Sequence, residues 1–298
     1  MKPNLFYIDP SNVDFLPPES GKEKPFNTWW MDLAHIPMIW KYSLGEHIKV
    51  AILDSGIGHH PELKGAIKEK VNFTDEDHYA DNNGHGTYIA GIIGARNTSS
   101  FIGIAPECAI YSAKVLRESN SSTMDFIING LNWALEKGVD IINLSISVRE
   151  YSSELHQLIK EISNRGILII CPAGNGNSIT YPARFKETIA VGGINRKFES
   201  YWAKGKEIDI YGPASGLYSL HHRGGISRVP GGTSFAAAFI TGISVLLLAL
   251  SRKGYLSYPI AGVNDLRQQL QQMAFSFSLS SQKSGFPVFS EDLFSLKL

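Results

Sequence analysis

The sequence has no excess of charge of either sign. Lysine and arginine together number 28, aspartate and glutamate also number 28, and the formal net charge is +0 at pH 7. Proteins that bind nucleic acid or anionic membranes electrostatically carry a basic excess, which this chain lacks. The sequence therefore predicts neither a nucleic-acid partner nor a membrane partner.

Cysteine is also scarce. Cys108 and Cys171 are the only two cysteines, and their separation is not that of metal ligands. So few cysteines fit a reducing compartment. We expect both to be free, buried thiols.

The sequence also lacks a recognisable targeting signal or membrane-spanning segment. The first thirty residues lack the basic n-region and continuous apolar h-region of a secretory signal, which predicts a cytoplasmic protein. The longest apolar run, residues 243–250 with its flanks, falls short of the ~20 residues that span a bilayer. We interpret it as a buried core helix. What the chain does have is 298 residues, 43% of them hydrophobic, which suffices for a sizeable core.

Apolar, β-rich runs alternate with segments of helical spacing along the chain. This repeated strand–helix–strand order predicts an α/β fold in three layers, a parallel β-sheet flanked by helices on both faces. Ligands of such sheets bind at the carboxyl ends of the strands. The expected strands are residues 48–56, 108–116, 139–147 and 167–175, and the expected helices are residues 85–95, 123–138 and 152–166.

Three polar residues occupy strand ends or helix starts. Asp54 ends the strand "VAILD", His85 opens a small-residue helix, and Ser234 opens the helix in "GGTSFAAAFITG". A serine hydroxyl becomes a nucleophile when a histidine takes its proton and an acid orients that histidine. The three residues are therefore candidates for a nucleophilic relay. Considered alone, Ser234 or Thr233 could equally be an N-cap that accepts backbone N–H bonds.

The motifs around these residues resemble those of the subtilisin-like serine proteases, the subtilases. "VAILDSGI" resembles the family's aspartate motif, "NGHGTYIAGII" its histidine motif and "GGTSFAAAFITG" its serine motif, in the order found in subtilisin. The likeness continues through "GIAPECAIYSAKVL", "PAGNGN" and "YPARFKETIAVGGI" and covers roughly residues 29–255. The resemblance implies a subtilisin-like fold and hydrolysis of peptide bonds.

The resemblance assigns a role to each matching residue. Asp54 would orient His85, His85 would act as general base and then general acid, and Ser234 would be the nucleophile. Asn175 in "PAGNGN" would donate its side-chain amide to the oxyanion, together with the backbone N–H of Ser234. Without the resemblance, Asn175 is equally a turn residue between glycines.

The resemblance also implies a set of substrate-binding residues, and at several positions the sequence departs from the family pattern. Thr180 stands where the family often has glycine, and Ser147-Val148 replaces a glycine pair, which predicts a narrower cleft. Tyr88 replaces a family histidine and matches none of the assigned roles. A proline usual after the nucleophile is missing from the run 235–238. Tyr181-Pro182 matches a cis peptide of the family. The implied substrate-binding residues are Asn120, Ser121 and Ser122 on one side, and Ser145, Ile146, Ser147 and Thr180 on the other.

No metal or other cofactor is predicted to be required. Many subtilases hold structural calcium, but the corresponding segment here, residues 95–106, has no acidic residue before Glu107. The acidic segment 74–84 is interpreted as a solvated loop with Asx turns. The pairs His59-His60 and His221-His222 lack the spacing of a zinc site and are expected to be exposed.

These observations predict a serine endopeptidase that works through an acyl-enzyme. A selective processing protease in the cytoplasm, for example one that removes leader peptides, is our main hypothesis. General intracellular turnover and a catalytically inactive peptide-binding homologue are the alternatives. We expect residues 1–28 to form a short extension without a folded prodomain, either a disordered leader or an arm that packs along the protease and restrains activity. Residues 29–255 are expected to form the peptidase domain. Residues 256–298 are expected to form a C-terminal helix and tail packed on that domain.

Overall fold

A seven-stranded parallel sheet forms the centre of the computed structural model, which describes residues 29–96, 101–275 and 285–290. The strand order is β2-β3-β1-β4-β5-β6-β7, and each neighbouring pair is parallel. The expected strands are confirmed. The strands are β1 (Lys49–Asp54), β2 (Ile67–Asn72), β3 (Ala109–Lys114), β4 (Ile141–Leu144), β5 (Leu168–Pro172), β6 (Ile189–Ile194) and β7 (Ile210–Pro213).

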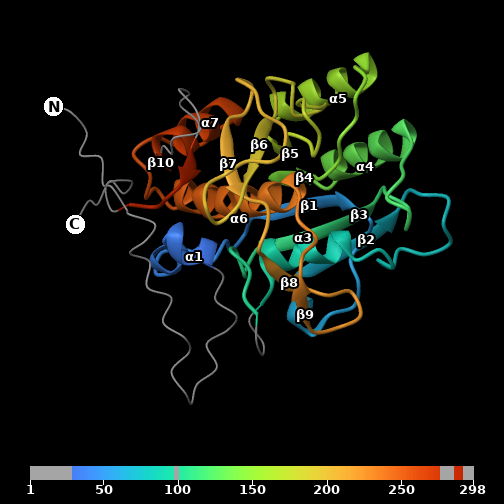
Figure 1. Ribbon diagram of the computed structural model, residues 1–298, viewed down its shortest axis with the longest axis horizontal. Helices are drawn as coiled ribbons and strands as arrows, with labels where there is room; N and C mark the ends of the chain where they lie inside the picture. Colours follow the sequence, from blue (N-terminus) through green and yellow to red (C-terminus); the bar gives the residue numbers. More distant parts are fainter. Residues whose placement is uncertain (1–28, 97–100, 276–284, 291–298) are drawn as a thin grey trace.

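Helices cover both faces of this sheet (Figure 1). On one face lie α4 (Met124–Glu136) and α5 (Ser153–Asn164), which contact each other. On the other face lie α3 (His85–Gly94) and the long helix α6 (Thr233–Arg252). The fold is therefore the three-layer α/β arrangement that the sequence predicts.

Amphipathic spacing explains why α4 and α5 pack on the sheet. In α5 the buried residues Leu155, Ile159 and Ile162 recur at helical spacing. Each helix begins at a hydroxyl cap, since the side chain of Thr123 accepts a hydrogen bond from the α4 backbone and Ser152 does the same for α5.

Helix α6 crosses the core of the molecule. Among the described residues it alone is long and apolar enough to cross a membrane, and its most apolar window is 100% buried in the fold. It is the buried core helix expected from the apolar run at 243–250. Two of its buried hydroxyls donate within the helix: that of Thr241 to the Ala237 carbonyl at 2.8 Å and that of Ser244 to the Ile240 carbonyl at 2.7 Å.

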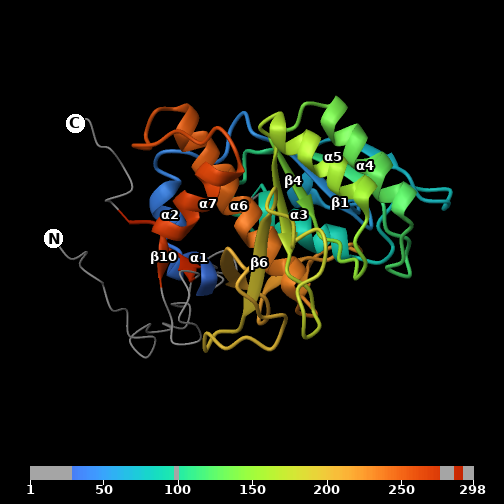
Figure 2. The ribbon, with the colours of Figure 1, turned by 90° about the horizontal axis from the view of Figure 1, so that it is seen from above.

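The two ends of the described chain lie side by side at the β7 end of the sheet (Figure 2). His35 Nδ1 lies 2.9 Å from the Phe289 carbonyl, and the Phe286 ring stacks on Phe239 of α6. The elements here are α1 (Trp29–Leu33), α2 (Ile36–Ile39), α7 (Val263–Gln272), β10 (Ala274–Phe275) and β11 (Phe286–Pro287).

Two smaller elements complete the fold. The 3₁₀ helix η2 (Pro61–Leu63) follows β1, and the antiparallel hairpin of β8 (Tyr218–Leu220) and β9 (Ile226–Arg228) packs beside α3. The N-terminal extension of residues 1–28, for which a disordered leader and a restraining arm are the two alternatives, lies outside the described residues, as do residues 97–100 of the segment considered for calcium.

Candidate active site

The carboxylate of Asp54 and the imidazole of His85 meet at the carboxyl end of β1. Asp54 Oδ1 lies 2.7 Å from His85 Nδ1 and also accepts a hydrogen bond from the Ser55 N–H at 2.7 Å. The carboxylate side chain is 1% exposed, whereas the imidazole is 21% exposed. His85 is thus anchored through Nδ1, which leaves Nε2 as the ring nitrogen that can exchange a proton with a neighbour.

Gly86 allows α3 to begin directly against the end of β1. A Cβ atom on Gly86 would lie 2.0 Å from the Gly56 carbonyl oxygen and 3.2 Å from the Asp54 side chain. A larger residue would therefore push the helix away from the strand. This close approach of backbone to backbone brings His85 within hydrogen-bond distance of Asp54.

The surroundings of His85 favour its protonated form. Burial by itself would lower the pKa of His85, but the charge and hydrogen bond of Asp54, with a further contribution from the charge of Asp81, outweigh burial and raise the pKa above its usual value. An imidazole that takes a proton readily is suited to act as a general base.

Ser234 is the second residue of α6. The N-cap position is Gly232, with φ 142°, and no side chain of that position caps the helix. Neither Ser234 nor Thr233 is therefore an N-cap, and that alternative is wrong. Ser234 is 9% exposed. Its N–H has no hydrogen-bond partner among the described residues, and a free N–H at a helix start favours negative charge.

Asn175 follows β5 and faces the start of α6. Its Oδ1 accepts hydrogen bonds from the Thr233 N–H at 2.8 Å and from the Thr233 hydroxyl at 3.0 Å. Because the oxygen is engaged in this way, the Nδ2 group is the part of the amide left to donate. Gly232 fits beside this amide because it has no Cβ atom, and a Cβ atom there would lie only 3.2 Å from Asn175 Nδ2.

A cleft of about 510 Å³ joins these groups, lined among others by His85, Asn175 and Ser234. No hydrogen bond links the Ser234 hydroxyl to His85 in the described part of the chain. Such bonds often tighten only when substrate is bound. Five of the seven expected substrate-binding residues line the same cleft, namely Asn120, Ser122, Ser145, Ile146 and Ser147.

Comparison with known proteins gives a family for this fold and cleft. A sequence model described as "Subtilase family" matches residues 45–287. The chain belongs to the subtilase family. It is accordingly a serine endopeptidase of the subtilisin type, and substrates of this enzyme class are peptides or proteins.

Two curated subtilases named as intracellular enzymes are among its relatives. The intracellular serine protease of Paenibacillus polymyxa is 34% identical over 241 residues, which is 76% of this chain and 74% of that one. The major intracellular serine protease of Bacillus subtilis is 35% identical over 237 residues, 74% of each chain. Among solved structures, a serine-to-alanine mutant of the protease domain of PatA aligns with a TM-score of 0.72 at 26% identity, covering 81% of this chain and 93% of that one.

Two of the expected substrate-binding residues in this subtilase, Ser121 and Thr180, do not line the cleft. The Ser121 hydroxyl is turned toward Arg117 and Ser119 instead. The Thr180 hydroxyl donates to the Ala173 carbonyl at 3.3 Å, and the side chain lies against Gly174. Any effect of Thr180 on substrate would therefore be exerted through the backbone that leads to Asn175.

Other residues line the cleft without having been expected from the sequence. Tyr88, which the sequence connects with no role, and Phe235 form one wall; the Phe235 ring centre is 5.4 Å from that of His85. The Tyr88 hydroxyl lies 2.8 Å from the Ser227 hydroxyl of β9. Three further apolar residues line the same cleft, Leu116, Met124 and Ile127, together with Ile146 and Val148, which are expected there from the sequence.

A buried polar chain connects the cleft to α6. The Ser145 hydroxyl donates to Asn143 Oδ1 at 2.9 Å, and Asn143 Nδ2 donates to the Thr241 hydroxyl at 2.8 Å. Asn143 is fully buried. Because a buried amide must find partners, this chain fixes the segment after β4 relative to the helix that carries Ser234.

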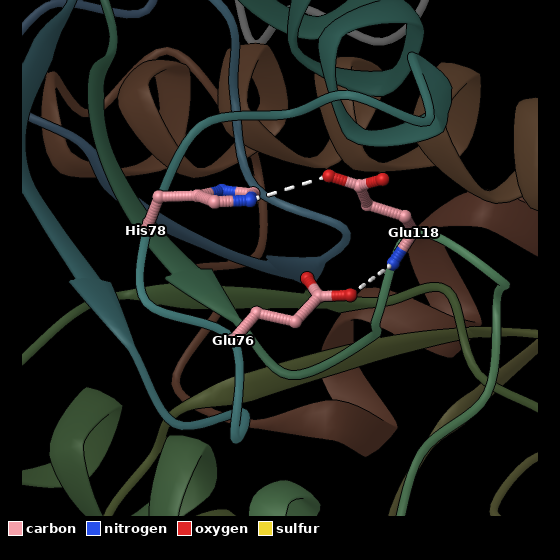
Figure 3. Close-up of side chains that lie close together, drawn as sticks. All are labelled: Glu76, His78 and Glu118. Atoms are coloured by element: carbon pink, nitrogen blue, oxygen red, sulfur yellow. Dashed lines mark hydrogen bonds and ion pairs between the residues drawn. The ribbon is translucent and has the colours of Figure 1, made fainter.

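Glu76, His78 and Glu118 converge beside the cleft (Figure 3), with ligand atoms within 4.8 Å of one another. However, Glu76 Oε2 lies 2.9 Å from the ammonium of Lys114, which is fully buried. Glu76 is thus the counter-charge of a buried cation, and a metal ion would compete with that cation. We assign no metal to this cluster, and the expectation that activity requires none stays a prediction.

Two expectations about exposure hold only in part. The segment 74–84 is largely accessible to solvent, as expected, but Asp81 near its end is buried. His60 is buried as well, since its Nε2 lies 2.9 Å from the Gly225 carbonyl and its Nδ1 accepts a hydrogen bond from the Glu62 N–H. Both side chains bind backbone groups of neighbouring segments, which repays the cost of removing them from water.

The two cysteines are free and buried, as expected. Burial raises the pKa of Cys108 to about 12 and also raises that of Cys171. Thiols in this state do not form the thiolate that acts as a nucleophile. Tyr181-Pro182 is cis, as the resemblance implies.

Proposed function

We propose that Asp54, His85 and Ser234 form the catalytic relay of this endopeptidase. The observation that carries the proposal is the 2.7 Å contact between Asp54 Oδ1 and His85 Nδ1 in a cleft that Ser234 also lines. The contact fixes the imidazole tautomer with its proton on Nδ1, so that Nε2 can accept the proton of the Ser234 hydroxyl.

The reaction then proceeds in two halves. Ser234 Oγ attacks the scissile carbonyl carbon while its proton passes to His85 Nε2, and the carbonyl oxygen takes the negative charge. The Ser234 N–H and Asn175 Nδ2 donate hydrogen bonds to that oxyanion. When the C–N bond breaks, His85 gives its proton to the leaving amine. Water, deprotonated by His85, next attacks the acyl ester, and Ser234 regains the proton as the acid leaves.

A fluorophosphonate probe tests this assignment. The wild-type protein is expected to become covalently labelled at Ser234, identified by mass spectrometry of the labelled peptide, and to cleave a fluorogenic peptide. The Ser234→Ala variant should do neither. An unlabelled, inactive wild-type protein would favour the alternative of an inactive peptide-binding homologue.

We further propose that the enzyme is a selective processing protease of the cytoplasm. One support is the pair of backbone hydrogen bonds, at 2.8 and 2.9 Å, between Tyr181 and Val148, which lines the cleft. These bonds occupy backbone groups that an edge strand would otherwise offer to substrate. The two relatives that are named as intracellular serine proteases support the location.

A diverse peptide library distinguishes selective processing from general turnover. Selective processing predicts cleavage at a small set of sequences, with an apolar side chain placed against Leu116, Ile127 and Val148. Cleavage spread evenly over the library would favour general turnover. Val148→Ala, which shortens a side chain that lines the cleft, should widen the accepted residues, while Ser178→Gly, at an exposed position outside the cleft, should leave the cleavage pattern unchanged.

A further inference from the structure

Asp81 is a buried carboxylate for which neither the proposed relay nor the sequence analysis accounts. Asp81 is 3% exposed, and no cationic side chain in the described part of the chain forms an ion pair with its carboxylate. An unpaired buried charge is costly unless hydrogen bonds compensate it. The partners of Asp81 therefore indicate what the fold gains from it.

Four donors saturate this carboxylate. Oδ1 accepts from the Ser55 hydroxyl at 2.9 Å and from the Gly84 N–H at 2.7 Å. Oδ2 accepts from the Thr87 N–H at 2.8 Å and from the Thr87 hydroxyl at 2.5 Å. A carboxylate has about four acceptor sites, so all of them are used.

These donors come from the two segments that carry Asp54 and His85. Ser55 directly follows Asp54, while Gly84 and Thr87 bracket His85 at the start of α3. The Ser55 hydroxyl also accepts from the Gly86 N–H at 3.0 Å. Asp81 therefore joins the end of β1 to the first turn of α3 at the level of the Asp54–His85 hydrogen bond.

We propose that Asp81 is a positioning residue of the relay, which sets the distance and orientation of His85 relative to Asp54 by holding Ser55 and the first turn of α3 together. The inference rests on the proposed function of His85 as the general base. Asp81 does not line the cleft and therefore does not touch substrate. Its negative charge at the N-terminus of α3 is also favourable to the helix dipole.

The charge of Asp81 gives the proposal a readout that a purely structural role would not have. Asp81 contributes to the raised pKa of His85. The titratable and charged groups around Asp81 and His85 include Asp54, Lys70 of β2 and His222 of the β8–β9 hairpin, and Asp81 also acts on the last two. The buried ammonium of Lys114 in β3 lies close as well, since it donates to the Ser55 carbonyl at 3.2 Å and to the Ala80 carbonyl at 3.1 Å. Removing the charge of Asp81 should move the pKa of His85 downward.

The test is Asp81→Asn, which keeps the shape of the side chain. Whichever way the amide turns, its NH₂ group cannot accept, so two of the four donors lose their acceptor. We expect kcat to fall about 10- to 100-fold with little change in KM, because small displacements of a catalytic group have effects of this order. The acid limb of kcat/KM should move to lower pH.

Asp77→Asn is the matched control, because Asp77 is exposed in the same loop and the substitution removes the same charge. It should leave kcat and the acid limb as in the wild type. Thr87→Ser should retain activity, whereas Thr87→Val should lower kcat without moving the acid limb, because the carboxylate remains.

Each outcome bears on one proposal. Failure of the wild-type protein to cleave peptide or react with fluorophosphonate would defeat the proposed function itself. An active wild type with unchanged kcat and acid limb in Asp81→Asn would overturn the inference alone. If Asp81→Asn does not fold, the Ser55→Ala and Thr87→Val variants test the proposal instead. A wild-type kcat in both variants would overturn the positioning role. A lowered kcat in both, at unchanged thermal stability, would support it.

Discussion

The first turns of α3 and α6 face the same cleft, but their backbone N–H groups differ in how many find a hydrogen-bond partner. At α3, side chains satisfy the first N–H groups: Asp81 binds those of Gly84 and Thr87, and Asn83 Oδ1 accepts from His85 at 3.2 Å. At α6, whose N-cap is a glycine as it is in α3, the Asn175 side chain accepts from the Thr233 N–H, but the Ser234 N–H has no partner in the described residues. The hydrogen bonds at the start of α3 hold the His85 side chain in place, whereas the free N–H at the start of α6 can bind a negatively charged oxygen.

The largest expected effect lies at the open end. Ser234→Ala should reduce kcat/KM by about 10⁶, the order found when a member of such a relay is removed. His85→Ala should cost a similar amount, and the double variant should be no slower than either single variant, because the relay acts as a unit. Ser178→Ala, at an exposed serine outside the cleft, serves as the control. A double variant much slower than both singles would contradict the assignment.

Asn175→Asp separates the two tasks of the Asn175 amide. A carboxylate can still accept from Thr233 and so preserve the start of α6, but it places an acceptor where the oxyanion needs a donor. We expect kcat to fall at least as far as the 10²- to 10³-fold loss known for such a donor in subtilisin, with unchanged thermal stability. Asn177→Asp, exposed in the same loop, should have little effect. Equal kcat in the two variants would remove Asn175 from the oxyanion site.

The pH dependence of kcat/KM reports on the capped end. His85 must be neutral to act as a base, and its pKa is raised above the ordinary value of 6.5. Activity should therefore fall with decreasing pH through a midpoint above 6.5. Because folding favours the protonated ring, the corresponding contribution to stability is present below the unfolded pKa and disappears as pH rises through the folded pKa. A midpoint at or below 6.5 would show that burial outweighs the carboxylates.

The smallest expected effect is on stability. Asn83→Ala removes one cap of α3, which typically costs about 0.5–2 kcal/mol in free energy of unfolding. The amide of Asn83 also donates to the Glu118 carbonyl at 2.7 Å, so the urea midpoint should shift in the direction of lower stability. Asn82→Ala, an exposed neighbour, provides the comparison. Equal midpoints would mean that water replaces this cap without loss.

The sequence reveals those features that depend on neighbours along the chain. Continuous apolar runs predict β1 and α6, which are buried on all sides, and small and apolar residues at helical spacing predict α3. Asp54 and His85 could be paired because carboxyl ends of parallel strands and the helix starts that follow them share one edge of the sheet.

Contacts between distant segments could not be predicted in this way. The hydroxyl of Tyr88 meets that of Ser227, 139 residues later, and His60 binds the Gly225 carbonyl, 165 residues away. Asp81 lies in a polar, acidic stretch whose composition is typical of a solvated loop. Its burial follows from donors on two other elements, which no local pattern contains.

Since both native thiols are buried and hold their protons, a cysteine introduced on the surface would be the only readily alkylated one in the chain. Position 178, exposed in the loop that leads from Asn175 to Tyr181, is suited to this purpose. A maleimide dye attached there would give a single-site fluorescent reporter of peptide binding, without any need to remove Cys108 or Cys171 first.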